Sequence, residues 1–536
     1  MRTTFVRFLR NRNGNFAMIT GLAALPLLLG VGMALDVSHV ARKHSQLQQA
    51  ADAAVLAVAR EGDKLSADRA HQIAEQFLAS NYNNAVSELR ISRDGTRVSL
   101  DVNAGTALAF GGLFGKEKWP LAVSASADVA YVDYEIGLVL DTTGSMKGGK
   151  LQAMKDAVVG LIDTMSAQVD QPERLKFAIV PFATFVNVGP QYGPKFDSAG
   201  KQIAGTGASW LDLEGKANFP QSELAPGASR FQLYENLGQK WRGCVETRGI
   251  GANLDVSDAA ADPNNPQTLF VPAFGIDEPD SYANSYIVSP AKPNDPSVAA
   301  KIARFKKYGV KTDSAGNPLL GGLLDPFWSI LSVITDPLTG KKYIPIDTAG
   351  GKGPGRGCDM DPITPLSNKY NDLKKKVNAL QANGNTNITE GVAWGLRVLS
   401  PGQPFTEGRD RSTGVQKIMI VLTDGANVFG NNGTGLGSSY SSYGYLVDGR
   451  LGISAGGQSA TNTLMNSRTL AACDKVKAEG IEVYTIRLEE PDVKTGTVLK
   501  ECASAPDHYF DVPTRTMLDE AFGKIRDKIV KLRISS

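Results

Sequence analysis

A largely apolar run at residues 134–140 that ends at Asp141 restricts the fold of this chain more than any other feature. Strands that are buried on both faces of a parallel sheet are continuously apolar, whereas strands with one exposed face alternate. A second run of this kind, residues 416–422, is followed by Thr423-Asp424-Gly425. Helical patterns separate the predicted strands, and such alternation indicates a sheet with helices on both faces. The expected fold class is therefore α/β with a doubly wound, Rossmann-like sheet.

The loop after the first apolar run carries three oxygen-bearing side chains, Asp141, Thr143 and Ser145. Open α/β sheets bind their ligands at the carboxyl ends of the strands, where this loop lies. Carboxylate and hydroxyl oxygens suit hard cations such as Mg²⁺, Ca²⁺ or Mn²⁺. The same residues could instead cap the helix that begins near Lys150. On this loop alone, both interpretations stay open.

The first 35 residues are typical of a cytoplasmic tail followed by a transmembrane anchor. Residues 1–13 hold four arginines and no acidic residue, and residues 16–35 carry no charge. A helix of that length spans about 30 Å, the hydrocarbon thickness of a bilayer, and the arginines place the N-terminus in the cytoplasm. Because the run is longer than the apolar core of a signal peptide, we expect an uncleaved anchor, with cleavage near Ala34 as the alternative.

Residues 36–132 are predicted to form a stalk helix and a small α/β module. Apolar residues, many of them alanine, recur every three or four positions along residues 37–58. This narrow face is equally compatible with core packing and with a seam for a partner. Alternating strands follow, and a long helix before a small sheet is also the outline of a pilin-like module.

Residues 133–536 are predicted to form one α/β domain with a loop-rich insertion at about 186–365. The insertion holds 18 of the chain's 27 prolines, which excludes long helices and central strands there. Around it the patterns predict strands at 174–182, 481–488 and 508–512, and helices at 150–167, 371–382, 389–399, 467–479 and 516–531.

Two features of this domain concern its stability and its surface. If the domain lies outside the cytoplasm, disulfides are expected between Cys244 and Cys358, which lie near the ends of the insertion, and between Cys473 and Cys502. A loop rich in Gly, Ser and Tyr at residues 435–445 follows Asp424 and is expected at the same sheet edge. It is either an adaptable binding rim or a disordered loop.

Composition excludes several functions. The 57 Lys and Arg residues against 55 Asp and Glu residues leave a net charge of +2, so no nucleic-acid partner is indicated. The chain has four histidines and no Cys-x-x-Cys pair, which leaves zinc sites and Ser-His-Asp triads without their residues. Asp-Thr-Thr-Gly at Asp141 differs from an aspartic-protease motif by an extra residue and has no second copy. No enzymatic activity is expected.

Three loops of the α/β domain supply candidate metal ligands in order: Asp141-Thr142-Thr143-Gly144-Ser145, Thr386 after Gly384-Asn385, and Asp424. In this order and placement the domain resembles a von Willebrand factor A domain with a metal-ion-dependent adhesion site, whose first motif is Asp-x-Ser-x-Ser.

The resemblance implies direct ligation of Mg²⁺ by Thr143, Ser145 and Thr386, with Asp141 and Asp424 acting through water or hydrogen bonds. Thr143 replaces the usual serine and keeps the hydroxyl. Thr389 is the rival of Thr386.

The N-terminal region carries a second resemblance. Residues 14–36, together with Leu47-Gln48-Gln49-Ala50-Ala51-Asp52-Ala53-Ala54, resemble the N-terminus of TadG-type proteins of the tight-adherence (Flp) pilus assembly apparatus. That family joins such an anchor to a von Willebrand A domain with a long insertion. Ile19 stands where related pseudopilins have a glutamate five residues after the processing glycine, so processing at Gly14 is not expected.

Together, the resemblances imply a single-pass protein of the bacterial inner membrane with most of its chain in the periplasm. Its A domain would bind a pilus or envelope protein that offers an acidic side chain to the metal. The alternative is a structural scaffold with an empty metal site, which would bind through its stalk helix or its insertion.

Overall fold

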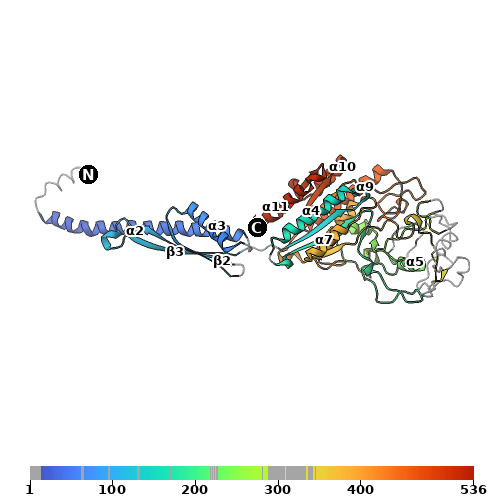
Figure 1. The fold of residues 1–536 in the computed structure, drawn as a ribbon, viewed down its shortest axis with the longest axis horizontal. Coiled ribbons are helices and arrows are strands. Elements are labelled where there is room, and N and C mark those ends of the chain that lie inside the picture. Colours follow the sequence, from blue (N-terminus) through green and yellow to red (C-terminus); the bar gives the residue numbers. More distant parts are fainter. Residues whose placement is uncertain are drawn as a thin grey trace. The chain divides into compact units, whose positions relative to one another are not determined.

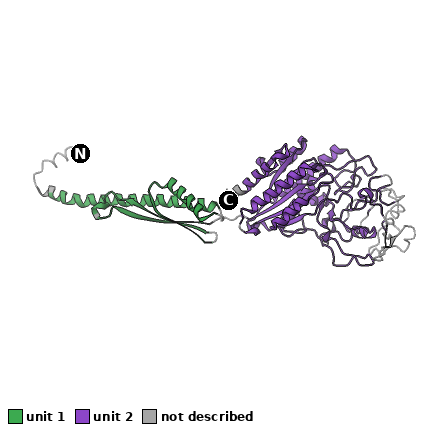
Figure 2. Cartoon of the chain, viewed as in Figure 1, with its two compact units in different colours: residues 1–131, 532–536 green, residues 132–531 purple. Residues whose placement is uncertain are grey.

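The computed structural model describes residues 14–535, except residues 62–64, 95–96, 129–132, 170, 218, 220, 223, 225–226, 280–281, 288–307, 309–333, 336–341 and 345. The chain divides into two compact units, residues 1–131 with 532–536, and residues 132–531 (Figure 2). The predicted anchor lies within the first unit, and its first 13 residues are outside the described residues.

The first unit is built on one long helix, α2 (Gly14–Arg60). A second helix, α3 (Ala67–Asn81), is capped by the Ser66 hydroxyl, which accepts the Arg69 backbone N–H. An antiparallel sheet follows in the order β1 (Val86–Asp94), β2 (Arg97–Ala107), β3 (Lys118–Asp128). Among the described residues, one helical stretch, Met18–Arg60 of α2, is long and apolar enough to cross a membrane, a property that a signal sequence shares.

The alanine-rich face of α2 belongs to the core of this unit. Its residues are buried against α3 and the sheet: Leu47, Ala50, Ala51, Ala54, Val55 and Val58. Small side chains let the helix approach the sheet closely, and β2 alternates buried and exposed residues as a strand with one covered face does. Of the two interpretations of this face, core packing is the one that the structure adopts.

The second unit, in which Figure 1 labels the helices α4, α7, α9, α10 and α11, contains a six-stranded sheet in the order β10-β5-β4-β11-β12-β13. The strands are β4 (Tyr134–Asp141), β5 (Leu175–Phe182), β10 (Thr364–Ser367), β11 (Gln416–Thr423), β12 (Glu482–Leu488) and β13 (Tyr509–Val512). Each neighbouring pair is parallel except β10 and β5, which are antiparallel. The expected α/β class is confirmed as a mixed sheet.

Helices cover both faces of this sheet, and each face has its own apolar core. Ile136, Leu138 and Leu140 of β4 pack with α4 (Gly149–Ser166), α7 (Tyr370–Ala379) and α11 (Leu518–Ser535). Val139 points the other way, into the core that α8 (Ile388–Leu399), α9 (Gln458–Ala478) and α10 (Val493–Cys502) help to form. Strand β4 is therefore buried along its whole length, which explains its largely apolar sequence; its buried Glu135 is paired with Arg409 and Lys417.

Three elements differ from the predictions. Helix α9 begins at Gln458 rather than at residue 467, because its first two turns are mostly polar and show no apolar period. Helix α10 was not predicted; its N-cap is Asp492, whose carboxylate accepts the Thr495 N–H. Strand β10 lies at the proline-rich end of the insertion, where Pro365 is tolerated because the strand is at the edge of the sheet.

The described part of the insertion has little regular structure but a large apolar core. Its helix and strands are short: α5 (Arg230–Asn236), β6 (Val186–Asn187), β7 (Cys244–Val245), β8 (Ile334–Thr335) and β9 (Lys342–Tyr343). Phe231, Trp241 and Phe270 share one core with Val139 and Val180 of the sheet. The insertion is thus packed onto one face of the sheet domain.

Short 3₁₀ helices mark many of the connections. They are η1 (Gly111–Phe114), η2 (Gly144–Met146), η3 (Pro172–Arg174), η4 (Pro190–Tyr192), η5 (Gly251–Val256), η6 (Pro266–Thr268), η8 (Ala349–Gly351), η9 (Arg411–Thr413), η10 (Leu446–Asp448), η11 (Pro506–His508) and η12 (Arg515–Met517).

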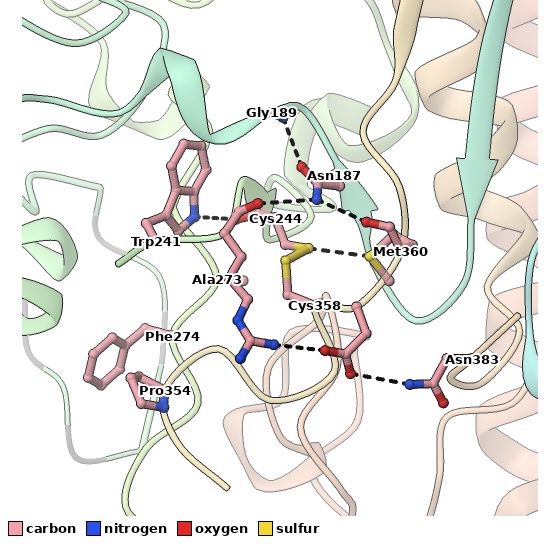
Figure 3. The surroundings of a disulfide bond; sticks show 12 residues. Asn187, Gly189, Trp241, Cys244, Ala273, Phe274, Pro354, Cys358, Met360 and Asn383 are labelled. Carbon is pink, nitrogen blue, oxygen red and sulfur yellow. Dashed lines mark hydrogen bonds and ion pairs between the residues drawn. A yellow bond between two sulfur atoms is a disulfide. The ribbon is translucent and has the colours of Figure 1, made fainter. Parts of the chain in front are cut away.

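Both cysteine pairs expected from the sequence are bonded in the structure. Cys244–Cys358 spans 114 residues with a Cα–Cα distance of 5.8 Å, and Cys473–Cys502 spans 29 residues with a distance of 5.1 Å. Figure 3 shows the first bond beside Asn187, whose side-chain amide donates to the Met360 carbonyl at 3.0 Å. The bond therefore joins Cys244 of β7, which pairs with β6, to the C-terminal part of the insertion.

The Gly/Ser/Tyr loop at residues 435–445 is neither an exposed rim nor disordered, so both interpretations of it were wrong. Tyr440, Tyr443 and Tyr445 are 9 %, 1 % and 0 % exposed. The Tyr440 hydroxyl donates to Glu246 of the insertion, and the Tyr445 hydroxyl donates to Glu278 at 3.1 Å. Buried carboxylates that need hydrogen-bond donors account for Tyr440 and Tyr445, whereas Tyr443 packs in an apolar cluster.

Candidate metal site

The candidate site lies where β4 and β11 end side by side. These strands are parallel neighbours, and Leu140 lies opposite Leu422, so Asp141 and Thr423 leave the sheet together. Thr386 reaches the same edge from the loop that precedes α8. Residues from three distant parts of the chain meet there because the carboxyl ends of parallel strands share one edge.

The predicted hydroxyl ligands are within hydrogen-bond distance of one another. The Thr143 and Ser145 hydroxyl oxygens are 3.0 Å apart, and the Thr386 hydroxyl donates to Thr143 Oγ1 at 3.3 Å. The Ser145 hydroxyl donates to Asp424 Oδ1 at 2.6 Å. Ser145 is exposed while the other three are buried, so the cluster opens to solvent on the Ser145 side.

Asp141 lies behind this cluster and holds two loops in place. Its Oδ1 accepts the Thr143 N–H at 2.8 Å, and its Oδ2 accepts the Thr423 hydroxyl at 2.6 Å. Burial, and after it the charge of Asp424, raises the pKa of the Asp141 carboxyl to about 6. Asp141 is therefore a residue that orders the loop carrying Thr143 and Ser145.

The structure separates Thr386 from its rival Thr389. Asn387 caps α8 by accepting the Glu390 N–H, so Thr386 remains outside the helix and faces the cluster. Thr389 lies in the first turn of α8, where its hydroxyl is 2.9 Å from that of Thr469 in α9. With Thr386 rather than Thr389 in the set, all five predicted residues lie at one edge of the sheet.

Lys150 belongs to this site although sequence reasoning did not include it. Its ammonium donates to Asp424 Oδ2 at 2.7 Å, and the Asp424 side chain is fully buried. A lysine in the first turn of a helix is unfavourable next to the positive end of the helix dipole. The unfavourable position of Lys150 in the first turn was the feature of the sequence that could have indicated an acidic partner.

The loop carrying Thr386 is attached to the end of the insertion. The Asn383 side-chain amide donates to Asp359 at 3.2 Å, and Asp359 follows the disulfide-bonded Cys358 (Figure 3). The Gly144 N–H donates to the Gly384 carbonyl at 2.9 Å, which joins this loop to the Asp141 loop.

The donor set fits a hard divalent cation. It consists of three hydroxyls and two carboxylates, and the described residues include no group of three or more His, Cys, Asp or Glu that could hold a metal ion. A Cβ atom on Gly425 would lie 3.3 Å from Thr386 Oγ1 and 3.7 Å from Ser145 Oγ, so the glycine leaves space over the hydroxyls. Oxygen-only donors suit Mg²⁺, Ca²⁺ or Mn²⁺ better than Zn²⁺.

Comparison with protein families gives a match at the N-terminus. Residues 14–61 match the family described as "Putative Flp pilus-assembly TadE/G-like". The N-terminal segment of this chain is TadE/G-like. The resemblance predicted for residues 14–36 and 47–54 is thereby confirmed, and it links the chain to a pilus-associated family. A search of curated proteins finds no relative of the sequence.

Solved structures similar to this one include pilus adhesins. The adhesin SpaC of Lactobacillus rhamnosus GG is 12 % identical with a TM-score of 0.31, and the match covers 84 % of this chain and 35 % of SpaC. The vWF domain of the tip protein Mfa5 of Porphyromonas gingivalis is 9 % identical with a TM-score of 0.31, covering 75 % and 96 %. The tip pilin GBS104 of Streptococcus agalactiae is 9 % identical with a TM-score of 0.31, covering 74 % and 99 %. TM-scores this low do not establish a common fold.

Proposed function

We propose that this chain is a membrane-anchored, metal-dependent protein-binding component of the Tad/Flp pilus assembly apparatus. The TadE/G-like segment supports the pilus assignment. The observation that carries the metal-dependent part is the convergence of Thr143, Ser145, Thr386 and Asp424 at one sheet edge. The anchor would lie in the bacterial inner membrane with the N-terminus in the cytoplasm and the bulk of the chain in the periplasm.

The sheet domain is proposed to be a von Willebrand A domain, spanning residues 133–536 with its insertion at about 186–365. Its strand order, with β4 and β11 central and the antiparallel β10 at one edge, supports this assignment. Helices on both faces of the sheet support it as well.

Thr143, Ser145 and Thr386 would hold the cation, and Asp141 and Asp424 would support it from behind. Bound Mg²⁺ would supply an electrophilic centre for a carboxylate of the partner protein. Asp141 keeps the Thr143 backbone and Thr423 in place through two hydrogen bonds. Lys150 neutralises the buried charge of Asp424.

A matched pair of isosteric variants tests this proposal. Thr386→Val removes a hydroxyl of the cluster, whereas Thr389→Val removes a buried hydroxyl of the same helix start that lies outside it. Calorimetric titration of the full chain with Mg²⁺ is expected to show binding in the wild type and Thr389→Val but not in Thr386→Val. Equal binding by both variants would contradict the site, and capture of the partner that persists in EDTA would contradict the metal-dependent function.

A second candidate function is a structural scaffold whose metal site stays empty. The Lys150–Asp424 ion pair favours it, because the ammonium already neutralises the carboxylate that a cation would approach. Since the alanine-rich face of α2 is buried, the insertion is the better candidate for partner binding in that case. Wild-type chain that takes up no Mg²⁺ while binding its partner normally would establish this function.

A further inference from the structure

The connection between β2 and β3, together with the start of β3, exposes apolar side chains in the first unit. Phe110, Leu113 and Trp119 are 37 %, 69 % and 45 % exposed. Outside α2, three of the four large hydrophobic residues described as exposed in this unit lie here, and the fourth is Phe77. The apolar surface is therefore concentrated at one place.

This connection has a defined structure. The Leu108 N–H donates to the Glu117 carbonyl at 2.9 Å, and the Lys116 N–H donates to the Gly111 carbonyl at 3.0 Å. A Cβ atom on Gly111 would clash with the Lys116 carbonyl oxygen, so the turn depends on a glycine. Exposure of Leu113 is thus a property of a hydrogen-bonded turn, which we call the β2–β3 loop (residues 108–117).

The β2–β3 loop is attached to α2 near the end of the apolar stretch of that helix. The Asp36 carboxylate accepts the backbone N–H groups of Ala109 and Phe110 at 2.8 and 2.9 Å. A Cβ atom on Gly32 would lie 2.8 Å from the ring of Phe110, so the ring packs directly on the helix backbone. Two independent contacts hold the loop at this level of α2.

These contacts lie at the end of the proposed membrane-spanning part of α2, which puts the loop at the boundary of the membrane. The uncharged run of α2 ends at Leu35. With a rise of about 1.5 Å per residue, Gly32 lies roughly 4–5 Å inside the end of the run and Asp36 just beyond it. Paired with two N–H groups, the Asp36 charge can lie at this depth without losing its hydrogen bonds.

The side chains of the loop and of the start of β3 suit the same environment. Tryptophan is enriched where a bilayer meets water, phenylalanine and leucine bury at the boundary of headgroups and acyl chains, and lysine reaches the lipid phosphates from there. Lys116 Nζ lies 5.5 Å from the centre of the Trp119 ring, and Lys118 is exposed beside it. Glu117 is the one acidic residue between positions 108 and 119.

We infer that the β2–β3 loop is a second membrane contact, which inserts Phe110 and Leu113 into the phospholipid interface beside the anchor. The inference rests on the proposed anchoring of α2. The partner of the loop is then the bilayer surface. This contact also fixes the rotation of α2 about its axis, because interfacial residues on one side of a helix set its orientation.

Site-specific labelling tests this inference in the full chain. The four native cysteines form two disulfides, so Leu113→Cys would be the one free thiol for an environment-sensitive fluorophore. The labelled chain is reconstituted into phosphatidylethanolamine–phosphatidylglycerol vesicles. Quenching is then measured with spin-labelled lipids and with aqueous iodide.

Two further positions serve as references. Leu56→Cys is matched in exposure, at 62 % against 69 %, and lies about 30 Å beyond Asp36 along α2. Leu25→Cys lies within the uncharged run. We expect spin-labelled lipids to quench the labels at positions 113 and 25 and iodide to quench the label at 56, with iodide quenching at 113 several-fold weaker than at 56.

The alternative outcomes separate this inference from the proposed anchoring. A label at 113 that iodide quenches as strongly as at 56, while position 25 is in lipid, overturns the loop contact alone. A label at 25 that iodide reaches overturns the anchoring and the loop contact together. A label at 113 that neither quencher reaches would show contact with protein, and it too overturns the lipid contact.

Discussion

Lys150 decides how a cation would meet Asp424. Its ammonium lies 2.7 Å from one carboxylate oxygen, and Ser145 donates to the other. The pair is largely shielded from water, with the lysine side chain 20 % exposed and the aspartate side chain 0 % exposed, so its attraction is weakly screened. At the proposed metal site, the affinity for a divalent cation would therefore depend on a residue that is not itself a ligand.

Replacing this lysine should strengthen metal binding. Lys150→Met removes a positive charge next to the site and keeps a long apolar side chain. We expect the Mg²⁺ affinity to rise about tenfold, equivalent to about 1.4 kcal/mol, in calorimetric titration. Lys147→Met, an exposed lysine three residues earlier, is the control and should leave the affinity unchanged. An unaltered affinity in Lys150→Met would mean that the lysine does not compete with the cation.

Glu246 is one of the residues that join the insertion to the segment after β11. Its carboxylate pairs with Arg230 at 2.6 Å and with Arg450, and it accepts the Tyr440 hydroxyl. Burial alone would raise the pKa of Glu246, but the two guanidinium groups outweigh burial and hold the pKa below its ordinary value.

Removing the charge of Glu246 should therefore destabilise the sheet domain. Glu246→Gln leaves two buried guanidinium groups without their anion, which typically lowers the free energy of unfolding by about 3–5 kcal/mol. Because the folded-state pKa is lowered, the stabilisation is complete above the ordinary glutamate pKa and is lost as the pH falls through the lowered value. Urea unfolding between neutral and acidic pH measures both effects. The exposed Glu214→Gln is the control, and equal stability of the two variants would refute the role of Glu246.

At the scale of elements, the two disulfides close loops of very different length. Cys244–Cys358 encloses 114 residues of a segment poor in regular structure, whereas Cys473–Cys502 joins α9 to the end of α10 across 29 residues. A cross-link stabilises mainly by restricting the unfolded chain, and the restriction grows with the logarithm of loop length.

The longer loop should make the first bond the more important one. Replacing Cys244 and Cys358 with serine is expected to lower the free energy of unfolding by about 5 kcal/mol, against about 3.5 kcal/mol for the Cys473 and Cys502 pair. Equilibrium urea unfolding of the two double variants provides the comparison. A larger loss from the second pair would show that packing between α9 and α10, rather than loop closure, dominates.

At the scale of the whole molecule, the chain combines a TadE/G-like helix with a mixed α/β domain. The helix is long and apolar enough to cross a membrane, and a signal sequence would satisfy the same criterion. Whether the first 35 residues are kept or cleaved therefore decides between an anchored protein and a secreted one.

We expect the mature protein to keep this segment. After carbonate extraction of bacterial membranes, the full-length chain should remain in the membrane fraction, because about 20 apolar residues hold a helix in the bilayer. Mass spectrometry of the mature N-terminus is the measurement. A mature chain that begins near Ala34 and is released by carbonate would contradict the anchor.

The sequence by itself predicted the elements in which burial follows a regular pattern along the chain. The apolar runs at 134–140 and 416–422 became β4 and β11, and the periodic segments became α4, α7, α8 and α11 to within a few residues. Such patterns are local, because most positions of a strand buried on both faces are apolar, and a surface helix is apolar at every third or fourth position. Helix α9 departed from its predicted start where its polar first turns carry no such pattern.

The tertiary structure alone decided which side chains meet. Thr386 rather than Thr389 joins the Asp141 loop because Asn387 sets where α8 begins, and Lys150 reaches Asp424 from 274 residues away. Tyr440 and Tyr445 are buried because the insertion supplies carboxylates that accept from their hydroxyls. These contacts follow from strand order and register, which bring distant loops to one edge, and no pattern within a single segment encodes them.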